Sequence, residues 1–245
     1  MGEVTNENVA GIIVTYNPDA SYFSAVINNA LHQVSHLVII DNNSSNFSEI
    51  LSQCDGPKFT IIRLEKNLGT EGAYNIVVDK LKLDHRNAWV IFPDQDTLLE
   101  FNYIQSLLES YNNSKIPVDD VWVLRGLERY RGKNKPIRRR NQFEIVKTAI
   151  MSGSVVKMEC LNKIRLREEF FLDHVDTDFY NKIRESGHCA LRFNDVTMMH
   201  SLGETIDFQG RPTTYHKSSS NYLATRNAVV LFLEGGLESK LVWFT

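Results

Sequence analysis

The sequence predicts an α/β fold in which helices flank a mostly parallel β-sheet. Short apolar runs rich in β-branched residues alternate along the chain with longer stretches of helical character, which is the pattern of βαβ units. Polar residues follow each apolar run directly, and in open α/β sheets such residues meet at the carboxyl edge of the strands, where ligands bind. A chain of 245 residues is long enough to bury the core that such a sheet needs.

The first hundred residues contain four expected strands. Apolar runs place them at residues 9–15, 37–40, 59–64 and 89–92. The turn Asn17-Pro18-Asp19 leads from the first strand into a helix expected over residues 21–34, and a second helix follows the third strand to about residue 83. The polar residues after these strands converge on one edge of the sheet, which predicts a nucleotide site.

The pattern changes beyond residue 100, where the expected elements are shorter and one stretch is strongly basic. In chain order they are a helix over 100–112, a strand over 121–124, a basic loop over 125–140, an extended segment over 143–151, a helix over 176–186, short strands over 190–193 and 196–199, and a helix over 219–234. Gly187 is placed to end the helix over 176–186, because glycine commonly follows the last turn of a helix.

Composition limits the classes of function. A net charge of -3 gives no argument for a nucleic acid partner. Cys54, Cys160 and Cys189 are widely spaced, so neither a disulfide framework nor a zinc cluster is expected. The N-terminus is polar and acidic, unlike a secretory signal, and no uncharged apolar stretch reaches the roughly 20 residues that cross a bilayer. We therefore expect a cytoplasmic protein, with the inner face of the membrane as a second location.

Two carboxylates one residue apart, in Asp94-Gln95-Asp96, directly follow the strand expected over residues 89–92. Carboxylate oxygens suit Mg²⁺ or Mn²⁺, and Mg²⁺ is usually shared with substrate phosphates. Their position at a strand end predicts a metal–diphosphate site. A polar strand end followed by a helix N-cap explains the same residues, and the motif alone does not decide between the two interpretations.

Five further motifs accompany Asp94-Gln95-Asp96 between residue 9 and about residue 227. They are Val14-Thr15-Tyr16-Asn17-Pro18, Val38-Ile39-Ile40-Asp41-Asn42-Asn43-Ser44, Asn67-Leu68-Gly69, Phe170-Phe171-Leu172-Asp173-His174-Val175-Asp176-Thr177-Asp178 and Met199-His200-Ser201-Leu202-Gly203. Together, and in this order, the six motifs resemble the family 2 glycosyltransferases of the GT-A fold, within the bacterial rhamnosyltransferase-like branch. The resemblance covers almost the whole chain, and it implies a Rossmann-like nucleotide-binding sheet with a smaller mixed acceptor-side region.

The resemblance implies a nucleotide-sugar site made by Thr15, Tyr16, Asn17, Asp41, Asn67, Gly69, Asp94 and Arg226. In it, Thr15 and Tyr16 flank the base, and Asp41 accepts a hydrogen bond from a pyrimidine N3–H. The Asp-Asn-Asn-Ser sequence explains Asp41 equally well through Asx-turn chemistry. An exposed helix position explains Arg226 equally well.

The same resemblance implies a divalent cation, Mn²⁺ or Mg²⁺, and a general base. The cation would be held by Asp96 with Asp94 and His200, since imidazole suits Mn²⁺ better than Mg²⁺. The base would be Asp176, with Asp173 as a partner in proton transfer. As alternatives, acidic residues favour a first helical turn, and a lone histidine at a strand end is more often structural.

The activity implied is inverting, metal-dependent transfer of a sugar, with L-rhamnose from dTDP-L-rhamnose as the first expectation. The acceptor would be a saccharide or a lipid-linked glycan in the synthesis of a bacterial surface polysaccharide or O-antigen. A UDP-linked hexose or galactofuranose is the alternative donor. A sugar nucleotidyltransferase is disfavoured, because the place of its Gly-rich phosphate loop holds Thr15-Tyr16-Asn17-Pro18. A non-catalytic nucleotide-binding module is disfavoured, because Asp94, Asp96 and Asp176 are all present.

We expect one GT-A domain over residues 1–245, with a nucleotide-binding half over 1–100 and an acceptor-binding half over 101–245. The basic stretch 125–140 is suited to a lipid-linked diphosphate, although a solvated loop explains most of it. The apolar segments 231–233 and 241–244 fit core, a homodimer surface or a peripheral membrane contact.

Overall fold

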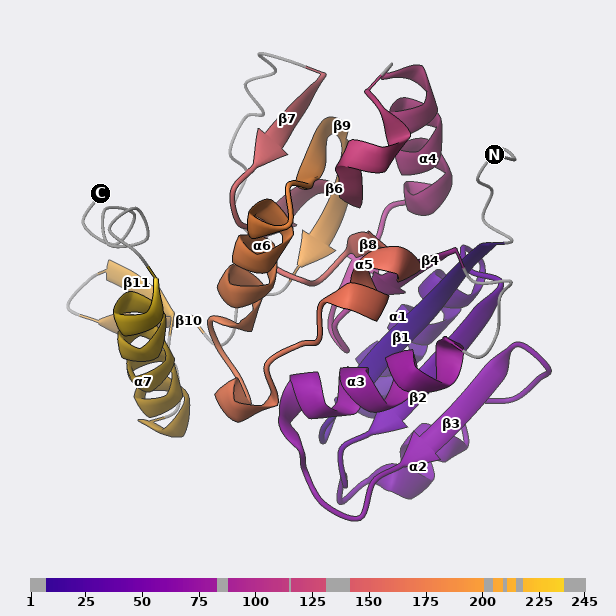
Figure 1. Ribbon diagram of the computed structural model, residues 1–245. Coiled ribbons are helices and arrows are strands. Elements are labelled where there is room, and N and C mark those ends of the chain that lie inside the picture. The colour runs from indigo at the N-terminus through magenta and orange to yellow at the C-terminus, as the bar shows by residue number, and fades with distance from the viewer. Residues whose placement is uncertain are drawn as a thin grey trace.

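The protein is an α/β molecule built on one large twisted sheet (Figure 1). The computed structural model describes residues 8–82, 88–114, 116–130, 142–200, 205–208, 211–214 and 218–235. In this part of the chain the large sheet has nine strands in the order β3-β2-β1-β4-β8-β6-β9-β5, and β7 pairs with β9 beside this path. The predicted fold class is confirmed.

The nucleotide-side part of the sheet is parallel. Its strands are β1 (Val9–Thr15), β2 (His36–Asp41), β3 (Phe59–Arg63) and β4 (Trp89–Phe92). β1 lies between β2 and β4 and runs parallel to both, while β3 extends the sheet beyond β2. Because the four strands point the same way, the loops that follow them open at a single edge of the sheet.

The other part of the sheet is mixed. Its strands are β5 (Leu98–Leu99), β6 (Val121–Tyr130), β7 (Phe143–Val146), β8 (Ser154–Lys157) and β9 (Cys189–His200). β8 is antiparallel to both β4 and β6, and β6 runs parallel to β9. β8 therefore joins the two parts of the sheet. A separate hairpin pairs β10 (Thr205–Phe208) with β11 (Arg211–Thr214).

Helices cover both faces of the sheet, because consecutive strand side chains point to opposite sides. The helices are α1 (Ala20–Leu31), α2 (Phe47–Leu51), α3 (Gly69–Leu81), α4 (Tyr103–Asn113), α5 (Met158–Lys163), α6 (Val175–Glu185) and α7 (Ser218–Glu234). Ile12 of β1 lies in a cluster with α3, α5 and α6, whereas its neighbour Ile13 lies in a second cluster with α1, α2 and α4. The alternation along one strand thus specifies two cores.

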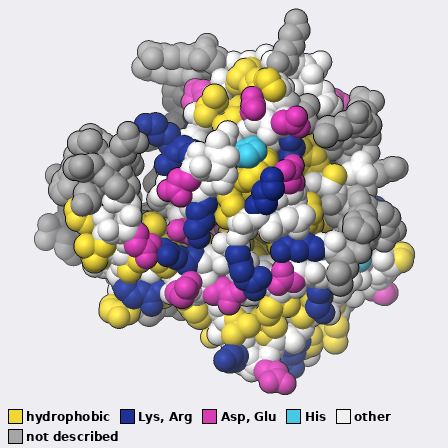
Figure 2. Space-filling view, viewed as in Figure 1, with side chains coloured by type: hydrophobic (Ala, Val, Ile, Leu, Met, Phe, Trp, Pro, Cys, Tyr) yellow, Lys and Arg dark blue, Asp and Glu magenta, His cyan; other side chains and the backbone are white. Residues whose placement is uncertain are grey.

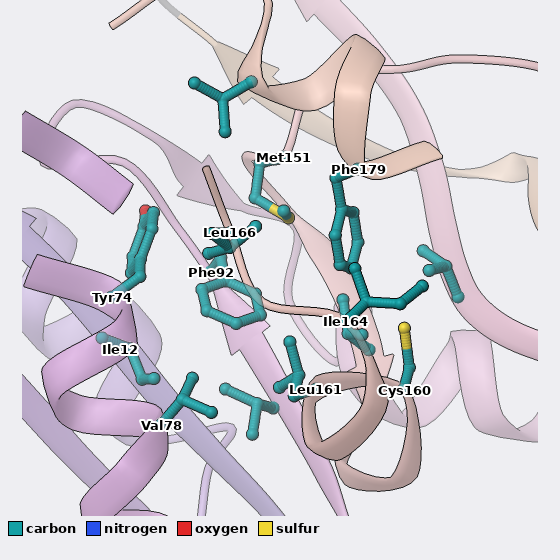
Figure 3. Packing of buried hydrophobic residues seen from close by; sticks show 14 of the residues in the cluster. Ile12, Tyr74, Val78, Phe92, Met151, Cys160, Leu161, Ile164, Leu166 and Phe179 are labelled. Atoms are coloured by element: carbon teal, nitrogen blue, oxygen red, sulfur yellow. The ribbon is translucent and has the colours of Figure 1, made fainter. Parts of the chain in front are cut away.

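The first of these cores lies beneath the candidate site, and Figure 3 shows its packing. Tyr74 of α3 meets Phe92 of β4 edge to face, with ring centroids 4.8 Å apart. Phe179 of α6 lies on the same face, so the helix that carries the predicted base is fixed to the sheet by apolar contacts. Burying one such aromatic side chain contributes about 1.5–3 kcal/mol.

The expected strands at residues 9–15 and 89–92 match β1 and β4, and the expected helices match α1, α3, α4, α6 and α7 to within a few residues. The assignment of residues 125–130 to a loop was wrong, because β6 continues to Tyr130. Arg125 is fully buried there, donating to Glu128 Oε2 at 2.7 Å and to the Ile150 carbonyl at 2.9 Å. The sequence alone does not distinguish a charged side chain that is buried with such partners from one that is solvated. Residues 131–140 lie outside the described part.

Further differences concern β9 and several short elements. The two strands expected over 190–193 and 196–199 form one strand, β9, whose pairing with β6 shifts register between Gly126 and Leu127. β5, β8, α2 and α5 are each six residues or fewer and were not predicted. Their apolar patterns are too short to show a period.

Charged side chains of both signs are interspersed on the face seen in Figure 2. Ion pairs between exposed side chains of the described part include Arg165 with Asp79 at 2.9 Å and Lys163 with Glu159 at 2.7 Å. Of the apolar segments noted near the C-terminus, Leu231 is buried in the core while Leu233 is 73% exposed, and residues 241–244 lie outside the described part. Among the described helices, none is both long and apolar enough to cross a membrane.

Candidate active site

The ends of β1 and β2 hold the first pair of predicted site residues. Thr15 lies opposite Asp41 in the parallel register, and both side chains are fully buried. Thr15 Oγ1 donates to Asp41 Oδ1 at 3.2 Å, and the backbone N–H of Ser44 donates to Asp41 Oδ2 at 3.0 Å. The Asx-turn contact is therefore present, and the contact of Asp41 with a base stays a prediction.

The loop after β1 is tied to the loop after β4. The backbone N–H of Tyr16 donates to Oε1 of Gln95 at 2.8 Å, and the Tyr16 side chain is 50% exposed. Asn17 adopts a left-handed conformation with φ 46°, and its Oδ1 accepts from the backbone of Ser45 at 2.8 Å. Gln95 thus ties the backbone of Tyr16 to the loop that carries Asp94 and Asp96, a function that the sequence motif did not reveal.

Asn67 and Gly69 form the turn into α3. Asn67 Oδ1 accepts from the backbone N–H of Gly69 at 2.9 Å, and Asn42 donates to the Gly69 carbonyl at 2.9 Å. Gly69 has φ +74°, and a Cβ atom on it would lie 2.4 Å from the Phe171 carbonyl oxygen. Only glycine fits this close approach. The helix on the nucleotide side therefore touches the acidic segment around Asp173.

Asp94 and Asp96 both follow β4 and are half-buried. Ser152 Oγ accepts from the backbone N–H of Asp94 at 3.1 Å, and the Asp94 carbonyl accepts from Thr97 at 3.1 Å. His200 ends β9, and its side chain lies outside the described part. Within the described residues, no three or more His, Cys, Asp or Glu side chains are arranged to hold a metal ion.

Asp176 is the second residue of α6, and its carboxyl group lies at the centre of the site. Its Oδ1 accepts a hydrogen bond from the backbone N–H of Met151 at 3.0 Å. Burial, together with the negative charge of Asp94, raises the pKa of Asp176 to about 7, while the Met151 N–H and Arg125 oppose the rise. Asp94 after β4 and Asp176 at the start of α6 are therefore close enough to interact.

The segment before α6 has an unusual backbone. Phe171, Asp173 and His174 all have φ between 60° and 63°, a region that residues other than glycine seldom adopt. Such conformations persist only where surrounding contacts enforce them. We refer to residues 170–174 as the acidic loop.

Asn227 of α7 supplies the contacts that hold the acidic loop. It is fully buried, and its Nδ2 donates to the carbonyls of Phe170, Leu172 and Asp173 at 3.0, 2.8 and 2.9 Å. Ser220, two turns earlier, donates to Asp173 Oδ2 at 2.9 Å. Sequence reasoning placed Arg226-Asn227 near the donor phosphates and did not reveal that Asn227 and Ser220 hold the acidic loop, because their partners are some fifty residues away and leave no periodic signal.

Arg226 lies against the same loop. Its Nη2 donates to the Phe170 carbonyl at 3.1 Å, and its Nε donates to Asn227 Oδ1 at 2.9 Å. Arg226 thus orients Asn227, so that the Asn227 amide nitrogen faces the carbonyls. The predicted contact of Arg226 with donor phosphates stays a prediction.

Glu71 also belongs to this part of the molecule, although sequence reasoning gave it no function. It lies in the first turn of α3 and is 6% exposed. Burial raises the pKa of Glu71 to about 8, and the charges of Asp176, Asp94 and Asp173 contribute to the rise. A single acidic residue in the otherwise small or apolar stretch Gly69-Thr70-Glu71-Gly72-Ala73-Tyr74 was the signal that could have identified it.

A parallel sheet edge with carboxylates close to an acidic helix start fits a glycosyltransferase of the GT-A fold, and the comparisons show this class. The model of the family described as glycosyl transferase family 2 matches residues 12–197. The chain therefore belongs to glycosyl transferase family 2. It is 27% identical over 240 residues to the dTDP-rhamnosyl transferase RfbF of Shigella flexneri, covering 92% of this chain and 80% of that protein.

Solved structures with the same fold include two of low sequence identity. TarS of S. aureus matches with a TM-score of 0.61 at 14% identity, over 96% of this chain and 77% of that one. GalNAc-T7, in a structure with UDP, GalNAc and Mn²⁺, matches with a TM-score of 0.67 at 13% identity, over 91% of this chain and 48% of that one. These similarities confirm the GT-A fold, and the family and the RfbF relative confirm a rhamnosyltransferase-like glycosyltransferase.

Replacing Asn227 with alanine should loosen the acidic loop. Three carbonyls lose their shared donor, so we expect the free energy of unfolding to fall by about 2–3 kcal/mol. The turnover rate should fall as well, because Asp173 and Asp176 lose their placement. Urea unfolding and steady-state kinetics measure the two effects. Asn112→Ala, at an exposed position of α4, is the control and should change stability by less than about 0.5 kcal/mol. Equal stability of the two variants would contradict the role of Asn227.

The pH dependence of transfer tests Asp176. A general base acts when deprotonated, and the pKa of Asp176 is raised to about 7. The rate should therefore fall as the pH drops below that value and level off above it. Asp176→Asn should lower turnover by about 10²–10⁴-fold and remove this acid limb, whereas Asp195→Asn, exposed on β9, should keep it. Near-normal turnover of Asp176→Asn together with collapse of Asp173→Asn would move the base to Asp173.

Proposed function

We propose that the protein is an inverting, metal-dependent glycosyltransferase that transfers L-rhamnose from dTDP-L-rhamnose. The acceptor is a saccharide or a lipid-linked glycan in the synthesis of a bacterial surface polysaccharide or O-antigen. The state of Asp176 supports an inverting mechanism, because its carboxyl group has a pKa near neutrality, interacts with the charge of Asp94 and is held by the Met151 N–H at 3.0 Å. The similarity to the dTDP-rhamnosyl transferase RfbF, over 92% of this chain, supports the donor.

The donor nucleotide lies at the carboxyl edge of β1, β2 and β4. Asp41 takes the pyrimidine N3–H. Each carboxylate oxygen has two lone pairs, so its contacts with Thr15 and Ser44 leave acceptor capacity for a base. Tyr16 is exposed enough to flank the ring. Asn17, Asn67 and Gly69 shape the pocket, Asp94 faces the ribose or the cation, and Arg226 lies on the phosphate side.

Asp96, with Asp94 and His200, would hold the divalent cation. Two carboxylates after one strand fit an ion that takes its remaining ligands from donor phosphates and water, as Mg²⁺ usually does. The similar fold of GalNAc-T7, whose structure contains Mn²⁺, supports a divalent cation. When bound, the ion neutralises charge on the leaving diphosphate as a Lewis acid.

Transfer is a single displacement at the anomeric carbon of the donor sugar. The acceptor hydroxyl oxygen forms a bond to this carbon while the bond from the carbon to the diphosphate oxygen breaks. The hydroxyl proton passes to Asp176, and the nucleoside diphosphate leaves with the bonding electron pair. The Met151 N–H holds one Asp176 oxygen at 3.0 Å, so the orientation of the base is set before the acceptor arrives.

Both substrates then meet between the two halves of one domain. Residues 1–100 contribute Asp41, Asp94 and Asp96 to the nucleotide side, and residues 101–245 contribute Asp176 to the acceptor side. A UDP-linked hexose or galactofuranose is the second candidate donor, favoured by the UDP in the GalNAc-T7 structure.

A panel of nucleotide sugars tests the donor. We expect the protein to hydrolyse or transfer from dTDP-L-rhamnose at the highest rate when Mn²⁺ or Mg²⁺ is present. Release of nucleoside diphosphate, measured for each donor, gives the ranking. A higher rate with a UDP-linked hexose or with UDP-galactofuranose would replace rhamnose by that sugar. No release from any donor, with acceptors of both classes supplied, would contradict the proposed function.

Chelation tests the cation and its ligand. EDTA should abolish transfer, and added Mn²⁺ or Mg²⁺ should restore it. Asp96→Ala should require far more cation for half-maximal activity, because one of the carboxylate ligands is lost. Asp55→Ala, exposed in the turn after α2, should behave as the unaltered protein. Full turnover of Asp96→Ala in the presence of chelator would refute the assignment of Asp96 as a ligand of the cation.

A further inference from the structure

Glu71 is a buried acidic residue with an unused oxygen atom. It is 6% exposed, and among the described residues its Oε2 has no hydrogen-bond partner. Its own backbone N–H is the hydrogen-bond donor that favours its charged form. Glutamate is almost never this buried unless it is paired, and a buried polar atom without a partner requires a specific explanation.

Among the described residues, the surroundings of Glu71 offer no ion pair as that explanation. The neighbouring charges that act on it are those of Asp176, Asp94 and Asp173, all of the same sign. Tyr74 lies three residues later on the same face of α3. Burial raises the pKa of Tyr74, and the charges of Asp94, Glu71 and Asp176 contribute to the rise. Glu71 therefore lies among the candidate site carboxylates.

Its position also defines the kind of ligand group. In the proposed function, Asp94 lies near the donor diphosphate and Asp176 lies near the attacking hydroxyl group. A side chain that is close to both carboxylates is therefore close to the sugar that is transferred. A phosphate oxygen would be repelled by the surrounding carboxylates. A sugar hydroxyl carries no charge and can both donate and accept a hydrogen bond, so it suits an acid whether or not that acid is protonated.

We propose that Glu71 is a further sugar-binding residue, whose Oε2 forms a hydrogen bond with a hydroxyl group of the transferred sugar. This inference rests on the proposed function, and it names a contact with the sugar and not with the nucleotide. It explains why an unpartnered buried oxygen is kept beside the candidate base: the ligand supplies the partner. Until the ligand binds, the open oxygen destabilises the fold, because its lost hydration is not replaced.

Two substitutions separate a ligand-binding role from a structural one. Glu71→Leu removes the open oxygen and leaves an apolar side chain of similar size. We expect kcat/KM for the nucleotide sugar to fall by about 10–100-fold, as for one lost hydrogen bond to a charged or strongly polar group. The Tm of the free protein should rise by about 2–4 °C, since the unpartnered oxygen is gone. Glu71→Gln keeps a hydrogen-bonding group and should retain most of the activity.

Binding of the nucleoside diphosphate alone, measured by calorimetry, is the second readout and should be unchanged in Glu71→Leu. Glu49→Leu is the matched control, because Glu49 also lies in the first turn of a helix, α2, but is exposed. It should leave kcat/KM unchanged and should not raise the Tm.

Three results would overturn the inference. A lower Tm in Glu71→Leu would make Glu71 structural. An equal loss of affinity for the nucleoside diphosphate would assign it to the nucleotide or to a cation. Unchanged kcat/KM, in a protein that transfers normally and loses activity in Asp176→Asn, would refute the sugar contact alone. Absence of transfer from every donor by the unaltered protein would instead refute the proposed function.

Discussion

The close approach of like charges is the constraint on which the site depends. Burial raises the pKa of Glu71 to about 8 and that of Asp176 to about 7, and the negative charges of Asp94 and Asp173 contribute to both rises. Without other constraints, such carboxylates would move apart, or water would enter between them. The fold prevents this by fixing each residue to a rigid element: Glu71 to α3, Asp94 to the end of β4, and Asp176 to α6.

The acidic loop is the part of this arrangement with the least intrinsic stability. Three of its residues have positive φ, and their conformation is maintained from outside by Asn227 and Ser220 of α7. The loop also touches Gly69 at the start of α3. One short segment thereby connects the nucleotide side, the base and the C-terminal helix. Any change in the position of α7 acts directly on Asp173 and, through the backbone, on Asp176.

Sequence reasoning succeeded where a pattern is local. β1 and β4 were located to the residue because each is a continuous apolar run of a fully buried parallel strand. It failed at β6, because the charge of Arg125 indicated a loop while its partners, Glu128 and the Ile150 carbonyl, buried it in a strand. It also missed β8, whose four residues join the parallel and mixed parts of the sheet.

The sequence by itself determined the class of fold, the sheet edge that carries the site, and the acidic motifs that place the chain in glycosyl transferase family 2. These follow from residue type and spacing along a few neighbouring positions. Only the tertiary structure decided that Asp94 and Asp176 share one space, that Asn227 holds the acidic loop, and that Glu71 faces the same carboxylates. The physical reason is that burial and charge act through space, between residues as far apart in the chain as Glu71 and Asp176, and no local pattern records which of them will meet.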